Sequence, residues 1–127
     1  MWIYHSDTGV LEHNGQTIAR GYSGHAPNGR GVPPDGINNP GLESDPDVGP
    51  IPRGQYEICA FFDDPEKGPI VAHLTPLPET NTFNRSGFMI HGDNYEGNES
   101  ASLGCIILTH PTRALIAGSG DVSLTVL

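Results

Sequence analysis

The chain is unusually rich in the two residues that α-helices tolerate least. It contains 17 glycines and 12 prolines among 127 residues, about twice the usual combined share of ~12%. Because glycine and proline are the least favourable residues in a helix interior, a mostly helical fold is excluded. The composition predicts a mainly β fold with many turns. The length is that of one domain, which we expect to cover residues 1–127.

Many of these residues are concentrated between Gly21 and Pro52. This segment holds seven glycines and seven prolines in 32 residues and has almost no apolar periodicity. A structureless segment of this length is uncommon in a compact domain and is usually functional or disordered. We expect an ordered Gly/Pro-rich loop over the sheet, with little regular structure, that forms one wall of a functional cleft.

The remaining apolar residues form short runs typical of strands. Asn14-Gly15 stands between the strand-like runs Val10–His13 and Gln16–Arg20, and this dipeptide predicts a tight hairpin because both residues accept a positive φ. A turn is expected at Asp63–Pro69 and a polar loop at Gly92–Ala101. Further strands are expected at Trp2–His5, Gln55–Phe62, Ile70–Leu77, Gly87–His91, Leu103–Leu108 and Val122–Leu127.

One short helix is expected near the C-terminal end. Thr109 is a candidate N-cap, Pro111 suits a first helical turn, and Gly118 would end a helix from His110 to Ala117. Seven or eight strands with a single helix indicate a curved sheet or a β-sandwich.

The charge balance excludes several classes of partner. Six basic residues against 15 acidic ones give a net charge of −9, so nucleic acid and anionic membrane surfaces are not expected to bind. No apolar run approaches the ~18 residues of a membrane span, and the N-terminal segment lacks the features of a signal peptide. The classes of partner that the charge still allows are small or cationic substrates and a basic partner protein.

The most specific chemical signal is the pair His91 and Cys105. His91 ends the apolar run FMIH, Cys105 lies in SLGCIIL, and 13 residues separate them. If the two runs are neighbours, the imidazole lies within hydrogen-bond reach of the thiol and would lower its pKa towards neutrality. The amides of Gly104 and Cys105 would stabilise a developing oxyanion, and Gly104, which lacks a side chain, would let substrate approach.

Other interpretations of this pair remain open. A cysteine in an apolar run is commonly a small buried hydrophobic residue, which is how we interpret Cys59. A buried Cys105 of that kind would favour a non-enzymatic binding or adaptor domain. A metal site would use His91, Asp93, Cys105 and His110, but zinc ligands usually occur at closer paired spacings. We therefore expect neither a metal nor another cofactor.

Two short motifs resemble the active-site signature of the L,D-transpeptidases. They are Ile90-His91-Gly92 and the later segment 102–106, SLGCI. A subgroup, the L,D-transpeptidase-like effector domain of type VI secretion systems, is more similar still. The matching segments cover nearly the whole chain: GYSGH (21–25), NNP (38–40), VGPIPRGQY (48–56), LTPLPETNTFNRSGFMIHGDN (74–94) and GCIIL (104–108).

The resemblance implies an L,D-transpeptidase-like fold and chemistry. Cys105 would be the nucleophile and His91 its base, oriented by the carbonyl of Gly92. The amides of Gly104 and Cys105 would form the oxyanion hole, and Ser102 would hold the turn. The substrate would be the peptidoglycan stem tetrapeptide: attack on its third residue would expel the terminal D-alanine. If water then released the peptide from Cys105, the protein would be an L,D-carboxypeptidase. If an amine released it, the protein would be an L,D-transpeptidase that exchanges D-amino acids.

The sequence departs from the general family pattern beside the cysteine. Leu103 stands where a second histidine is usual, and Ile107 and Leu108 stand where Arg or Asn is usual. The substrate carboxylate thereby loses its usual partner, and the nearest basic residues along the chain are Arg85 and Arg113. The candidate substrate-binding residues are Ser102, Arg85, Arg113, His25 and Asp93.

The resemblance also implies where the protein acts. An effector of this type is made in the cytoplasm without a signal peptide and acts in the periplasm of target bacteria, with a secretion-machine carrier and a cognate immunity protein as partners. The alternative enzyme class is a papain-like cysteine amidase or peptidase acting on the cell wall. In that class the cysteine usually precedes the histidine and opens a helix, whereas here His91 comes first and Cys105 lies in a strand-like run.

Overall fold

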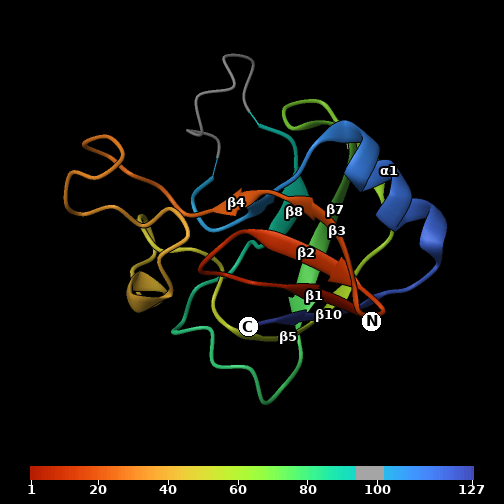
Figure 1. The fold of residues 1–127 in the computed structure, drawn as a ribbon, viewed down its shortest axis with the longest axis horizontal. Helices are drawn as coiled ribbons and strands as arrows, with labels where there is room; N and C mark the ends of the chain where they lie inside the picture. Colours follow the sequence, from red (N-terminus) through yellow and green to blue (C-terminus); the bar gives the residue numbers. More distant parts are fainter. Residues whose placement is uncertain (94–101) are drawn as a thin grey trace.

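The computed structural model describes residues 1–93 and 102–127. In these ranges the chain forms a mainly β domain with one short α-helix, as predicted (Figure 1). The strands are β1 (Trp2–Tyr4), β2 (Val10–His13), β3 (Gln16–Arg20), β4 (Tyr22–Ser23), β5 (Gly54–Ile58), β6 (Phe62–Asp64), β7 (Gly68–Pro76), β8 (Met89–His91), β9 (Ile106–Ile107) and β10 (Ser123–Val126). The helices are α1 (His110–Ser119) and a 3₁₀ turn, η1 (Pro40–Leu42).

The strands form one large mixed sheet. Its order is β3-β2-β1-β10-β5-β7-β8-β9-β4, and β6 pairs with β7 outside this path. Two pairs are parallel, β1 with β10 and β8 with β9. The sheet is curved but is not closed into a barrel in the described residues, because β3 and β4 remain its two edges. No helix in the described ranges is long and apolar enough to span a membrane.

The Asn14-Gly15 hairpin is confirmed. Both residues have positive φ, 51° and 83°, and they join β2 and β3 as an antiparallel pair. Residues 94–101 of the polar loop expected at Gly92–Ala101 lie outside the described residues.

The single strand expected over Gln55–Phe62 is instead divided into β5 and β6. Ile58 pairs with Leu74, but Phe62 pairs with Val71. The chain therefore advances four residues from Ile58 to Phe62 while β7 advances only three, from Val71 to Leu74. A β-bulge introduces an irregularity of this kind.

The predicted end of the helix is also wrong. Gly118 stays inside α1, and Gly120 ends it with a left-handed φ of 71°. A glycine accepts this conformation without the steric cost that a Cβ would add, which is why it commonly follows the last helical turn.

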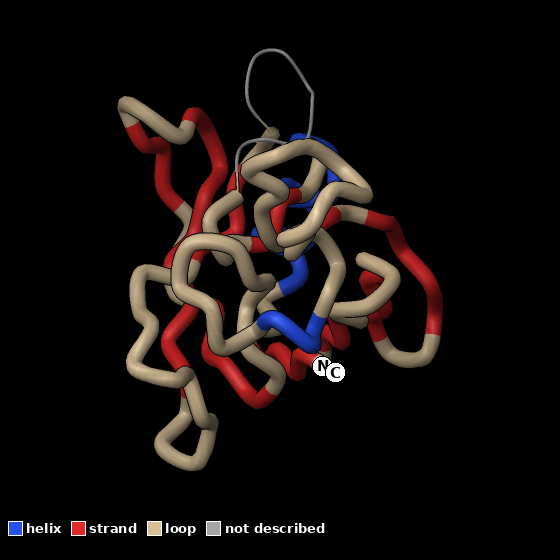
Figure 2. The backbone as a smooth tube through the Cα atoms, turned by 90° about the vertical axis from the view of Figure 1, so that its left-hand side faces the viewer, coloured by secondary structure: helices blue, strands red, loops and turns tan. Residues whose placement is uncertain are grey.

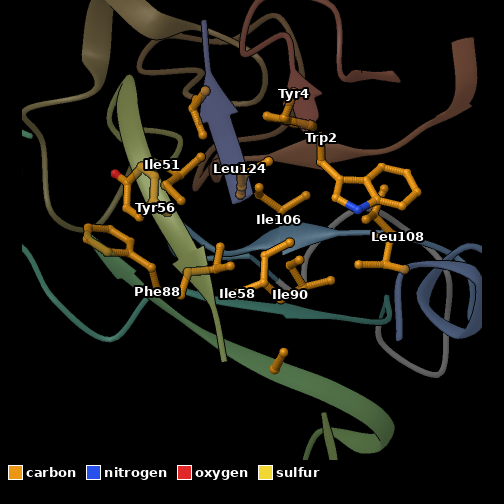
Figure 3. Packing of buried hydrophobic residues seen from close by; sticks show 14 of the residues in the cluster. Trp2, Tyr4, Ile51, Tyr56, Ile58, Phe88, Ile90, Ile106, Leu108 and Leu124 are labelled. Atoms are coloured by element: carbon orange, nitrogen blue, oxygen red, sulfur yellow. The ribbon is translucent and has the colours of Figure 1, made fainter. Parts of the chain in front are cut away.

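The main hydrophobic core lies inside the curve of the sheet. Side chains from β1, β5, β8, β9 and β10 point toward one another there (Figure 3). Trp2, Tyr4 and Ile106 are each at most 1% exposed. A second, smaller cluster contains Tyr22, Ile37 and Ile107, with Ala26 and Cys105 packed against it. The long loop therefore packs against the sheet on the side of Cys105.

The segment between Gly21 and Pro52 has little regular structure, as predicted. It contains only β4 and η1, and loops and turns like it, tan in Figure 2, make up a large part of the chain. Backbone hydrogen bonds order it: the His25 amide donates to the Val48 carbonyl, and the Gly36 amide donates to the His25 carbonyl. A Cβ on Gly36 would lie 1.8 Å from the Val48 oxygen, so only glycine allows this close approach.

The core assignment predicts different effects for two leucines. Leu124 is 2% exposed and Leu115 is 51% exposed. Leu124→Ala is expected to lower the free energy of unfolding by about 2–5 kcal/mol, because it removes buried methyl groups and leaves a cavity. Leu115→Ala, the matched control, is expected to change it by less than about 0.5 kcal/mol. Urea unfolding measures both, and equal effects would contradict the assigned core.

Candidate active site

His91 ends β8 and Cys105 directly precedes the adjacent parallel strand β9, so the prediction that their runs are neighbours is confirmed. Ile90 pairs with Ile106, and both side chains point into the main core. Because side chains alternate along a strand, His91 and Cys105 point to the opposite face. The register places Cys105 beside Met89, diagonal to His91. The expected hydrogen bond between the two side chains is not formed in the described residues, because Nε2 of His91 has no partner and the thiol donates to the Gly87 carbonyl.

The imidazole of His91 is held in one tautomer. Its Nδ1 lies 2.8 Å from the carbonyl oxygen of Gly92, and since a carbonyl only accepts, Nδ1 carries the proton. This is the contact that the resemblance implied. Nε2 is left with a lone pair, is buried, and has no hydrogen-bond partner in the described residues. Burial lowers the pKa of His91, so the ring is neutral at neutral pH and Nε2 can accept a proton.

The protonation of Cys105 corrects the expectation from sequence. His91 was expected to lower the pKa of the thiol, but burial raises it. The Met89 amide and the cations of Lys67 and Arg85 oppose that rise without cancelling it. The thiol donates to the Gly87 carbonyl, with Sγ 3.7 Å from the oxygen. The resting pair is therefore a thiol and a neutral imidazole, and not a thiolate and an imidazolium.

Ser102 holds the turn before Cys105. The side chain is fully buried, and its hydroxyl donates to the Cys105 carbonyl at 2.8 Å. The same oxygen accepts from the amides of Gly24 at 3.0 Å and Gly104 at 3.1 Å. These bonds join the long loop to the turn that carries the thiol. They also engage the Gly104 amide, which leaves the Cys105 amide as the candidate oxyanion donor, a correction to the expected pair.

Arg85 stabilises the same turn through hydrogen bonds to backbone carbonyls, and these bonds occupy its guanidinium. Its guanidinium is buried and donates only to backbone carbonyls among the described residues. Gly104 has a φ of +120°, and a Cβ there would lie 2.3 Å from Nη2 of Arg85. The space above Gly104 that was expected to admit substrate is thus filled by this guanidinium. The acceptors are the carbonyls of Glu43 (2.6 Å), Pro50 (2.7 Å), Gly49 (3.0 Å) and Leu103 (3.4 Å).

Arg113 donates to backbone carbonyls near His91, as Arg85 does near Cys105. It projects from α1, which lies beside β7 (Figure 1), and it is 5% exposed. A Cβ on Gly92 would lie 2.5 Å from its Nη1. No carboxylate in the described ranges forms a salt bridge with Arg113 or Arg85. Burial lowers the pKa of Arg85, and the carboxylates of Asp45 and Asp47 act against that lowering from a distance. The acceptors of Arg113 are the carbonyls of Leu108 (2.7 Å), Ile70 (2.9 Å) and Pro69 (3.2 Å).

Asp93 and His25 have different surroundings. Asp93 accepts a hydrogen bond from the Tyr22 hydroxyl at 2.7 Å and lines an open cleft of about 490 Å³. His25 directly follows Gly24, which donates to Ser102, and its Nδ1 is buried without a partner in the described residues. No group of three potential metal ligands occurs in the described part of the chain.

Lys67 is the residue that sequence reasoning missed. It lines the same cleft as Gly92 and Asp93, and it is the only lysine in the chain. The sequence placed it in a surface turn far from both motifs. The antiparallel pairing of β7 with β8 brings that turn to the end of β8 where His91 lies.

The resting protonation state predicts the pH dependence of alkylation. Because only the thiolate reacts and burial raises the pKa of Cys105, iodoacetamide labelling should rise at a pH above that of an ordinary thiol. The profile should have no shoulder below neutral pH. Cys59→Ala protein isolates the signal of Cys105, and mass spectrometry measures it. A shoulder at acidic pH that disappears in His91→Ala would show a thiolate–imidazolium pair and contradict this assignment.

Comparison with known proteins identifies a family. A family model described as the Tlde1 domain matches residues 17–120, a range that includes the long loop, His91 and Cys105. Neither the curated proteins nor the solved structures gave a match. Cys105 precedes strand β9 and does not open α1, unlike the cysteine of the papain-like class. The chain belongs to the Tlde1 domain family of type VI secretion effectors.

Proposed function

We propose that this domain is an L,D-carboxypeptidase and L,D-transpeptidase that acts on peptidoglycan stem tetrapeptides through a cysteine thioester. The observation that carries the proposal is the base: His91 presents a buried, unpartnered Nε2 on the sheet face that also carries the Cys105 thiol. Its other nitrogen is fixed by the Gly92 carbonyl. These features support a base and its orienting group on the same face as the nucleophile.

Acylation begins with the neutral pair. As Sγ of Cys105 attacks the carbonyl carbon of the third stem residue, its proton passes to Nε2 of His91. The Cys105 amide stabilises the oxyanion of the tetrahedral intermediate. When the intermediate collapses, the C–N bond breaks and the imidazolium gives its proton to the nitrogen of the departing D-alanine. A thioester of the tripeptide remains on Cys105.

Deacylation repeats these steps with a new nucleophile. His91 takes a proton from water or from the amine of a D-amino acid as that group attacks the thioester carbon. The C–S bond breaks, and the thiolate of Cys105 recovers a proton from the imidazolium. Water releases the tripeptide, whereas a D-amino acid releases an exchanged tetrapeptide.

The electrostatics support this cycle. Arg85 and Arg113 lie buried behind Gly104 and Gly92 without a paired carboxylate among the described residues. Positive charge held in a site of low dielectric stabilises the oxyanion more than it would in water. As an effector, the domain would meet its substrate in the periplasm of a target bacterium, and a cognate immunity protein would protect the producing cell.

The nucleophile is tested by two substitutions. Cys105→Ala is expected to abolish conversion of tetrapeptide stems to tripeptides, and Cys105→Ser to retain almost none, because the serine hydroxyl is a much weaker nucleophile with a neutral histidine as its only base. Cys59→Ala is the matched control and should retain full activity. Mass spectrometry of digested muropeptides provides the measurement. Tripeptide formation by Cys105→Ala, or its loss in the presence of a chelator, would overturn the mechanism.

The base is tested through His91→Ala. This substitution should lower kcat/KM by a factor of about 10²–10⁴, the range for loss of a general base. His73→Ala, a histidine on β7 whose side chain is exposed, should change it little. Added D-amino acids should divert wild-type product into exchanged tetrapeptides. An unchanged rate in His91→Ala would remove this residue from the mechanism.

A further inference from the structure

The positive charges of this acidic chain are gathered around one cleft. The chain has six basic residues against 15 acidic ones. Three of the six, Arg20, Lys67 and Arg113, line the cleft of about 490 Å³ that Gly92 also lines, together with His110 and with one carboxylate, that of Asp93, which accepts from the Tyr22 hydroxyl. An acidic protein that concentrates its few cations along one cleft presents a local positive potential there. That potential favours an anionic ligand.

The position of Lys67 follows from strand register. It lies in the turn between β6 and β7, where the Asp64 carboxylate accepts from the amides of Glu66 at 2.8 Å and Lys67 at 2.9 Å. The pairing of Ala72 with Ile90, continued toward the start of β7, brings this turn to the end of β8. That register sets Ile70 opposite Gly92, and Lys67 lies three residues before Ile70, on the wall of the cleft that Gly92 also lines.

Among the described residues, Lys67 and Arg20 are the two cations of this cleft whose side chains form no hydrogen bond or ion pair, and of the two only Lys67 acts on the reacting groups. The Arg113 guanidinium donates to three backbone carbonyls, whereas no carboxylate in residues 1–93 and 102–127 forms an ion pair with Lys67. Its ammonium also acts on both reacting groups. Burial chiefly lowers the pKa of His91, and Lys67 lowers it further. Burial raises the pKa of Cys105, and Lys67 opposes that rise.

The chemistry of the leaving group identifies the anion that fits. In the proposed reaction His91 protonates the nitrogen of the departing amino acid. In an α-amino acid the carboxylate is separated from that nitrogen by a single carbon. When the nitrogen is at Nε2 of His91, the carboxylate must therefore lie within a few ångströms of the imidazole. Neither His91 nor Cys105 lines the cleft, but its lining includes Gly92, the residue that follows His91, and Lys67.

Resting on the proposed function, we propose that Lys67 and this cleft form a carboxylate subsite on the leaving-group side of the scissile bond. It binds the C-terminal carboxylate of the tetrapeptide before cleavage and the carboxylate of the incoming D-amino acid during exchange. The subsite makes the enzyme selective for stem peptides whose C-terminal carboxylate is free. It is the partner for the substrate carboxylate that the sequence beside Cys105 lacks.

The test compares two tetrapeptides, one with a free terminal carboxylate and one with a terminal carboxamide. The wild type should prefer the free acid in kcat/KM by about tenfold or more, the effect expected for a charge-assisted hydrogen bond. Lys67→Met should lose about tenfold on the acid and little on the amide, so that the preference disappears, and Lys67→Arg should restore it. Arg30→Met, which removes an exposed charge paired with Asp35, controls for net charge.

Binding separates this proposal from the function on which it rests. Calorimetry on Cys105→Ala protein should show that Lys67→Met weakens binding of the acid by about the same factor and leaves binding of the amide unchanged. Equal losses on acid and amide would place the recognised carboxylate elsewhere on the stem, and no loss on either would remove Lys67 from recognition. Both outcomes overturn the subsite. Failure of the wild type to cleave the acid while it still binds through Lys67 would overturn the proposed function alone.

Discussion

The parallel pairing of β8 with β9 is the constraint on which the rest of the site depends. It sets Ile90 beside Ile106, and these side chains anchor the two strands in the main core. With that face buried, His91 and Cys105 are turned to the other face together. A shift of one residue in either strand would send one of the pair into the core. The buried pair Ile90 and Ile106 thus determines the face to which the neighbouring His91 and Cys105 point.

The second constraint is electrostatic. The turn that carries Cys105 is fastened by the hydroxyl of Ser102 and by the guanidinium of Arg85, which donates to backbone carbonyls on both the turn and the long loop. Arg113 fastens the region behind His91 in the same way. Each arginine therefore supports the backbone and also supplies charge. In a chain with a net charge of −9, these cations oppose a field that would otherwise disfavour a thiolate or an oxyanion.

The sequence predicted the features that depend on neighbouring residues, such as the hairpin at Asn14-Gly15 and the run that ends at His91. It failed where distant segments decide the outcome. The thiol of Cys105 was expected to be acidic, but packing of the long loop buries it and raises its pKa. The role of Gly104 was misjudged, because it depends on the position of the Arg85 guanidinium. The position of Lys67 near the site was missed, because it depends on the pairing of β7 with β8. No local pattern records those positions.

The central claim is that Cys105 carries the substrate as a thioester, and intact-protein mass spectrometry tests it most directly. Wild-type protein mixed with a stem tetrapeptide and quenched in acid during turnover should gain the mass of the tripeptide less one water. Peptide mapping should locate that adduct on Cys105, and hydroxylamine should remove it, as expected for a thioester. Turnover of the tetrapeptide without an adduct, or an adduct located on Cys59, would contradict the account.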